Sequence, residues 1–160
     1  MLTDSHWISI KDGDHRAHFL YTRHYSCRHY ADHRRICKII GPGQYMLLIT
    51  EACDALFAWH KFNDKSGQTG VCCSIFRNES DILSSTLILQ AVQLALARWP
   101  ATRLYTYINP TKIRSTNPGY CFRKAGWIPA GHTKKGLIIL ALPPATSSIG
   151  QQNEPAPVFT

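Results

Sequence analysis

An apolar run of strand length leads into the strongest helical pattern of the chain, and this pair of elements most constrains the fold. Residues 71–76 read VCCSIF, a continuous apolar run typical of a strand that is buried on both faces. Residues 86–99 read TLILQAVQLALARW, with Ser84 and Ser85 where N-caps are expected and Pro100 as the stop. Such a strand followed by such a helix is typical of α/β and α+β domains.

The remaining residues alternate between short strand patterns and two further helices. A helix is expected from Asp14, its N-cap, to about Tyr25, and a short helix opened by Pro118 over 117–127. Strands are expected at 6–10, 35–40, 44–50, 54–62 and 103–109, with a hairpin over 127–142. The second strand of the antiparallel pair 44–50 and 54–62 should alternate outward and inward side chains.

This order predicts a single α/β (α+β) domain over residues 1–142, with a central mixed sheet flanked by helices. Residues 143–160 are rich in Pro, Ser and Gln and are expected to form a disordered tail. No apolar run approaches the roughly 18–20 residues that span a bilayer, and the N-terminus lacks a signal-peptide pattern, so a cytoplasmic protein with no membrane partner is expected.

Positive charge is in excess and is clustered. The chain has 18 Lys and Arg against 10 Asp and Glu, a net charge of +8. Clustered cations attract polyanions, which favours nucleic acid as partner; the alternative is a solvated basic surface. The residues expected to contact DNA phosphates are Arg28, Arg34, Arg35, Lys112, Arg114, Arg123 and Lys124.

Several motifs carry a resemblance to a known fold. The order of elements and the segment GYCFRKAGW (119–127) resemble the GCN5-related acetyltransferase (GNAT) fold. Within that superfamily the chain is most similar to the Mom family of phage DNA adenine-modification proteins. The matching segments are RHYS (23–26), GPG (41–43), FRNES (76–80), the serine-led helix and YINPTKIRSTNPGYCFRKAGW (107–127), which together span about residues 6–142.

The resemblance implies a fold and an activity. In the GNAT fold, the strands corresponding to 71–76 and 104–108 are splayed, and the gap holds the pantetheine arm of an acyl donor. The similarity to the Mom family implies modification of adenine N6 in double-stranded DNA to a carbamoylmethyl or acetamido-type adduct, which protects the DNA from host restriction in the cytoplasm of the infected cell. Base flipping would expose the amine.

The small-molecule donor is left open by the sequence. The usual phosphate-binding loop of the fold contains glycines, whereas residues 77–85 read RNESDILSS and contain none. Glu79 and Asp81 add negative charge where a diphosphate would lie. Acetyl-CoA is therefore an alternative donor, and Arg77, Asn78, Ser84 and Ser85 are the expected donor-binding residues.

The expected catalytic residues are His24, Tyr25, Ser26, Arg77, Asn109 and Tyr120. His24, Tyr25 and Ser26 match the H-Y-S residues of the family, and a histidine suits proton transfer from an amine near pH 7. Each of these residues also has a structural reading. Arg77 could be a solvated strand-end charge, Asn109 a turn residue and Tyr120 a core aromatic.

Metal binding and two other functions remain alternatives. A catalytic iron or other ion at His24 and Tyr25 is one; a structural zinc among His24, His29, His33 and nearby cysteines is less favoured, because only His29 and His33 have helical ligand spacing and no C-x-x-C pair occurs. The other functions are an acyl-CoA-dependent N-acetyltransferase of a protein or small molecule and a non-catalytic basic DNA-binding module.

Overall fold

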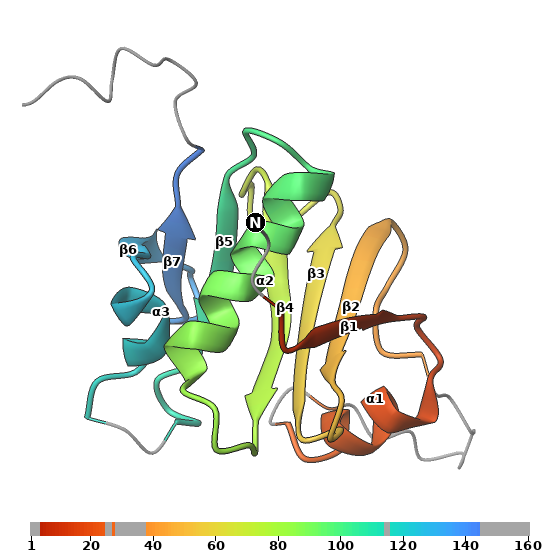
Figure 1. Cartoon of the computed structure of the whole chain (residues 1–160). Helices are drawn as coiled ribbons and strands as arrows, with labels where there is room; N and C mark the ends of the chain where they lie inside the picture. The colour runs from red at the N-terminus through yellow and green to blue at the C-terminus, as the bar shows by residue number, and fades with distance from the viewer. Residues whose placement is uncertain (1–3, 25–26, 28–37, 114–115, 145–160) are drawn as a thin grey trace, which may run out of the picture.

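A single open sheet of seven strands forms the centre of the molecule (Figure 1). The computed structural model describes residues 4–24, 27, 38–113 and 116–144. The predicted tail therefore lies almost wholly outside the described residues, as does most of the strand expected at 35–40. The described elements are β1 (Trp7–Ile10), α1 (His15–Tyr21), β2 (Gln44–Thr50), β3 (Ala55–Lys61), β4 (Val71–Asn78), α2 (Ser84–Arg98), β5 (Leu104–Ile108), α3 (Tyr120–Lys124), β6 (Ile128–His132) and β7 (Ile138–Leu142).

The sheet is mixed, which confirms the predicted α+β class with a central mixed sheet. Its strand order is β1-β2-β3-β4-β5-β7-β6, and every neighbouring pair is antiparallel except β4 and β5. The parallel pair is short: its register covers only Val71–Cys73 on β4 opposite Leu104–Thr106 on β5. Parallel neighbours need a crossover, and α2 provides it. Beyond Cys73 and Thr106 the two strands separate.

The face of the sheet that α2 covers holds the larger core. Indole groups fix the helix to the sheet, because Trp7 Nε1 donates to the carbonyl of Leu87 and Trp59 Nε1 to that of Ala91, both at 2.9 Å. Trp127 stacks on Trp59 with 6.1 Å between ring centroids. These contacts satisfy buried donors while the aromatic rings remove apolar area from water.

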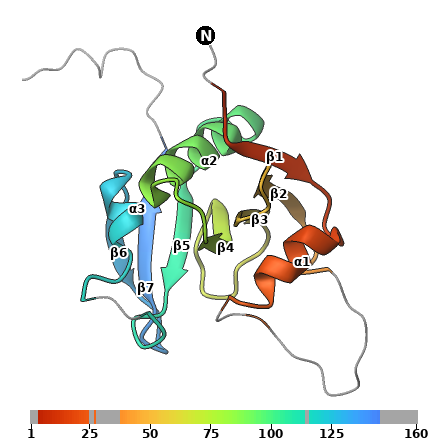
Figure 2. The same cartoon turned by 60° about the horizontal axis from the view of Figure 1, so that its bottom comes forward.

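The opposite face is covered by α1, as Figure 2 shows with the strands seen nearly end-on. Ala17 and Leu20 of α1 pack there on Leu47, Leu56 and Ile75. Covered by α2 on one side and α1 on the other, β3 is buried at every position except its last residue. The predicted alternation of inward and outward side chains in this strand was therefore wrong.

The boundaries of all three helices differ from the sequence prediction. α3, expected over 117–127 with Pro118 at its start, covers only Tyr120–Lys124 and has Gly119 as its N-cap. α1 has the expected N-cap, Asp14, whose carboxylate accepts from the amide of Arg16, but the helix ends at Tyr21. α2 begins at Ser84 with Leu83 as its N-cap and no side-chain cap bond, so Ser84 and Ser85 are not the caps. Ser85 is buried instead. Among the described residues, no helix has the length and apolar character needed to cross a membrane.

The start of the parallel pair depends on a close backbone approach at Gly70. Its φ is +113°, and a Cβ there would lie 2.0 Å from the carbonyl oxygen of Arg103, which also accepts from the amide of Val71. Gly67, in the same loop, has φ +85° but no atom within 4 Å of the corresponding point. Substitution of Gly67 therefore introduces backbone strain alone, whereas substitution of Gly70 introduces strain and a clash with the neighbouring strand.

We expect Gly70→Ala to lower the free energy of unfolding by at least about 2 kcal/mol more than Gly67→Ala, because only the first combines a positive φ with a backbone clash. Gly67→Ala should cost about 1 kcal/mol for its φ alone. Urea titration of both variants would measure the difference. Equal losses would show that the contact with Arg103 does not constrain the pair.

Candidate active site

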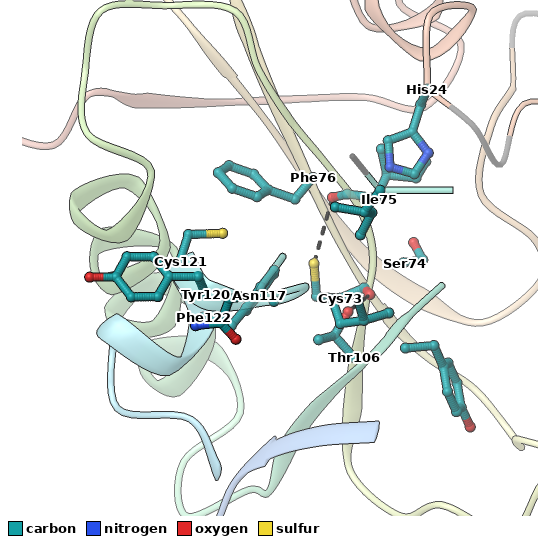
Figure 3. A pocket seen from close by; sticks show the side chains of 14 residues that line it. His24, Cys73, Ser74, Ile75, Phe76, Thr106, Asn117, Tyr120, Cys121 and Phe122 are labelled. Carbon is teal, nitrogen blue, oxygen red and sulfur yellow. Dashed lines mark hydrogen bonds between the residues drawn. The ribbon is translucent and has the colours of Figure 1, made fainter. Parts of the chain in front are cut away.

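A cavity of about 330 Å³ lies where β4 and β5 separate (Figure 3). A β-bulge contributes to the separation: Cys73 pairs with Trp59 and Ile75 with Ala58, so Ser74 is the extra residue on β4. Bulges bend a strand and increase its twist. The residues that line the cavity are His24, Cys73, Ser74, Ile75, Phe76, Thr106, Tyr107, Ile108, Ile113, Asn117, Gly119, Tyr120, Cys121 and Phe122.

The cavity reaches both faces of the sheet. Ile75 belongs to the core under α1, whereas Phe122 belongs to the core under α2, and both line it. Figure 3 shows His24 and Tyr120 on opposite sides of the opening. The side chain of Thr106 on β5 bridges the two strands, since its hydroxyl donates to the carbonyl of Cys73 on β4 at 2.8 Å. Two molecules could thus approach the same cavity from different sides.

His24 lines the cavity from the turn that follows α1. Its amide donates to the carbonyl of Tyr21 at 2.8 Å, and its carbonyl accepts from Cys27 at 3.0 Å. Burial lowers the pKa of His24 from 6.5 to about 4, and the positive charge of Arg77 adds to the effect. The imidazole is therefore neutral at pH 7, the form that can accept a proton, and is a weaker base than a solvent-exposed histidine. Tyr25 and Ser26, the other two residues of the expected motif, lie outside the described part of the chain.

Three charged side chains meet beside His24. Glu79 accepts from Arg23 at 2.7 and 2.8 Å through both carboxylate oxygens, and from Arg77 at 2.5 Å. Hydrogen bonds from Arg23 and then Arg77 lower the pKa of Glu79 to about 2. Glu79 therefore orients Arg77, and it also binds Arg23, which sequence reasoning did not connect with it.

Part of the loop from β4 to α2 is closed to a diphosphate group. Three of its amides already donate within the protein: Glu79 to the carbonyl of Asp54 at 2.7 Å, Ser80 to Asn78 Oδ1 at 2.9 Å and Ile82 to Ser80 Oγ at 3.1 Å. Two residues predicted to bind the donor are part of this network, since Asn78 Nδ2 donates to Ser84 Oγ at 2.9 Å. No open cradle of amides remains at Glu79, Ser80 and Ile82 for coenzyme A.

The other two predicted catalytic residues occupy different positions. Tyr120 lines the cavity and is 54% exposed, so it is not the core aromatic of the alternative reading. Asn109 does not line the cavity; its side-chain oxygen accepts from the amide of Thr111 at 3.1 Å and from its hydroxyl at 2.7 Å. These bonds form a local turn, which favours the turn-residue reading of Asn109.

Tyr107, which forms one wall of the cavity, is hydrogen-bonded through its hydroxyl to the loop between β3 and β4. Asp64, in the loop before β4, accepts from the hydroxyl groups of Tyr107 at 2.7 Å and Tyr105 at 2.8 Å. Burial, together with the bond to Asp64, raises the pKa of Tyr107 to about 12, so it stays protonated. Ser66 also bonds to the Tyr107 hydroxyl. Sequence reasoning missed this cluster, because its members are far apart along the chain.

Two thiols and one serine also line the cavity without having been predicted. Burial raises the pKa of Cys73 and Cys121, so both are neutral thiols rather than nucleophilic thiolates. Ser74 is exposed within an otherwise largely buried strand. It is the only polar residue in the run VCCSIF, and that lone polar position was the available sequence signal for the bulge.

Basic side chains flank the cavity-lining segments. Lys112 precedes Ile113, and Arg123 and Lys124 follow Phe122; all three cations are exposed. The other residues expected to contact DNA lie outside the described ranges: Arg28, Arg34, Arg35 and Arg114.

The described residues do not by themselves form a metal centre. They contain no group of three or more His, Cys, Asp or Glu side chains placed to hold an ion. His24 is described but Tyr25, His29 and His33 are not, so the iron and zinc alternatives stay predictions.

We expect the folded protein to lose stability as the pH falls from about 6.5 to about 4. In this window His24 is protonated in the unfolded chain but resists protonation in the native cavity. The shift from 6.5 to about 4 corresponds to a loss of up to about 3 kcal/mol. Denaturant titrations at pH 7 and pH 4.5 would measure it. In His24→Gln the difference between the two pH values should shrink by about 2.5 kcal/mol, the part of the loss that falls between pH 7 and pH 4.5; an unchanged difference would contradict the assignment.

The chain was compared with protein-family models, with curated proteins and with solved structures, and none of the three comparisons finds a match.

Proposed function

We propose that this protein is a DNA-modifying transferase with a GNAT-like fold that acts on adenine N6 in double-stranded DNA. One observation carries the proposal: a neutral histidine, His24, lines a largely apolar cavity between the two diverging parallel strands. The sequence similarity to the Mom family supports the same function. The adduct would be of the carbamoylmethyl or acetamido type and would protect DNA from restriction.

The size and walls of the cavity suit a flipped base. Its volume of about 330 Å³ is near the lower end of the roughly 300–1,000 Å³ of small-molecule sites. Phe76, Phe122 and Ile108 supply apolar walls against which a planar ring can pack. Because the adenine amine is involved in base pairing within duplex DNA, flipping would bring it to the cavity.

The proposed chemistry assigns proton transfer to His24. The lone pair of the N6 amine is delocalised into the ring, so removing an N6 proton makes the nitrogen a better nucleophile. A bond forms between N6 and a carbon of the donor, the bond from that carbon to its leaving group breaks, and His24 accepts the proton. Tyr120, across the opening, would donate a proton to the leaving group after its side chain turns, because its hydroxyl is directed away from His24 in Figure 3. The donor approaches from the face of the sheet opposite the base.

The composition and hydrogen bonds of the β4–α2 loop disfavour the acyl-CoA alternative. The loop has no glycine, and the amides of Glu79, Ser80 and Ile82 have partners within the protein. We therefore expect calorimetric titration with coenzyme A to give no saturable binding at micromolar concentrations. Saturation in that range would instead support an ordinary N-acetyltransferase.

Plasmid DNA from cells that express the protein should contain an adenine nucleoside of increased mass. Mass spectrometry of nucleoside digests would identify the base and the group added. His24→Gln should lower the modified fraction at least about 100-fold, the order of magnitude that a general base contributes. His15→Gln, an exposed histidine on α1, is the matched control and should retain activity. Unmodified nucleosides with folded wild-type protein would contradict the proposal.

Replacing the basic residues beside the cavity should weaken binding to duplex DNA. In Lys112→Ala/Arg123→Ala/Lys124→Ala, the slope of log affinity against log salt concentration should fall by about 0.9 for each phosphate that the variant no longer neutralises. The control is Lys134→Ala/Lys135→Ala, in the turn between β6 and β7, which removes exposed charge elsewhere. Equal effects of both variants would indicate only non-local attraction.

The third alternative, a non-catalytic DNA-binding module, makes a different prediction for the same variants. Under it, His24→Gln leaves every measurable function intact, because the cavity has no role. Loss of modification with retained DNA binding excludes the binding module.

A further inference from the structure

Arg23 connects the turn that carries His24 to the end of β4. Its guanidinium forms a two-pronged ion pair with Glu79, with nitrogen–oxygen distances of 2.7 and 2.8 Å. The same group lies 4.6 Å from the ring centroid of Phe19 and donates to the Phe19 carbonyl at 3.4 Å. Arg23 is therefore held from both sides, and His24 is the next residue along the chain.

Glu79 is itself fixed by contacts outside the cavity. Its amide donates to the carbonyl of Asp54 at 2.7 Å, in the turn between β2 and β3. Asp54 is in turn held by the hydroxyl of Thr50, which donates to it at 2.6 Å. The carboxylate of Glu79 also binds Arg77 at 2.5 Å. The anchor thus directly follows β4 and is bonded to the turn between β2 and β3, whereas Arg23 belongs to a turn beyond the end of a short helix.

The magnitude of the interaction shows what it can do. Arg23 and Glu79 side chains are 37% and 29% exposed, and ion pairs in such settings stabilise a fold by about 0.2–1 kcal/mol. The pair is therefore a minor contributor to global stability. A two-pronged guanidinium–carboxylate contact nevertheless fixes direction as well as distance, and catalytic groups need placement within about 0.5 Å.

We propose that Glu79 is a positioning residue, which holds His24 at the cavity by anchoring Arg23 to the end of β4. Its role in catalysis rests on the function proposed above, but the positioning itself does not. Glu79 is not among the residues that line the cavity. It acts through Arg23, and its bond to Arg77 keeps that neighbouring cation directed at a carboxylate. The negative charge of Glu79, which disfavours a diphosphate site, serves in this proposal to bind Arg23 and Arg77.

The test is the accessibility of His24 to a histidine-specific reagent. Reaction with diethyl pyrocarbonate at pH 7, followed by peptide mass spectrometry, gives the rate at His24 relative to the exposed His132 in β6. We expect Arg23→Gln to raise this ratio several-fold. Arg16→Gln is the matched control, since it breaks a 2.8 Å ion pair with Asp14 at the other end of α1, with comparable exposure of 52% and 23%. It should leave the ratio unchanged.

A second pair of variants tests the anchor. Glu79→Gln should raise the ratio as Arg23→Gln does, and Glu79→Asp, which keeps the charge, should restore it in part. All of these variants should remain folded, with melting temperatures within roughly 4 °C of wild type, because about 1 kcal/mol is at stake. A His24 rate that stays at the wild-type value in both folded variants, Arg23→Gln and Glu79→Gln, would overturn the inference.

The same variants separate positioning from function. If wild-type protein modifies DNA, Arg23→Gln should lower kcat while DNA affinity changes less than twofold. If wild-type protein modifies no base but His24 still becomes accessible in Arg23→Gln, the proposed function fails and the positioning role stands. If activity falls without a change in accessibility, Arg23 acts in some other way and the positioning role is wrong.

Discussion

The short parallel pairing of β4 and β5 is the constraint on which the rest of the structure depends. Only Val71–Cys73 and Leu104–Thr106 are in register, and the bulge at Ser74 turns the remainder of β4 away. Where β4 and β5 separate, their facing edges have no ladder between them, and the space is lined by side chains and by backbone groups of these edges. Aromatic rings, two thiols and a histidine line that space, so the cavity is a direct result of an interrupted ladder.

Much of the fold could be predicted because its elements carry local signals. Apolar runs, glycine turns and proline stops identified most of the strands, and the run at 71–76 is buried as predicted except at Ser74 and, in part, Phe76. The errors arose where tertiary contacts decide. β3 was expected to expose one face, but α1 covers it. The expected caps, Ser84 and Ser85, were displaced by a loop that Asn78 organises through its own hydrogen bonds.

The candidate site was predictable in part for the same reason. His24 and Tyr120 line the cavity, and each belongs to a motif that is continuous in sequence. The contacts that hold its walls join residues far apart: Arg23 and Glu79 are separated by 56 positions, and Asp64 and Tyr107 by 43. A single sequence contains no signal that pairs such residues, because neither partner is unusual alone. Only the folded arrangement shows that Glu79 binds two arginines.

The distribution of tryptophan gives the two sides of the sheet different optical properties. All four tryptophans of the chain, Trp7, Trp59, Trp99 and Trp127, lie in the core beneath α2. The side covered by α1, from which His24 enters the cavity, has none among its core residues. Intrinsic fluorescence therefore reports on the α2 layer, and rearrangements of the turn after α1 would leave the emission largely unchanged. A fluorescent label attached near Phe19 would report separately on the layer formed by α1.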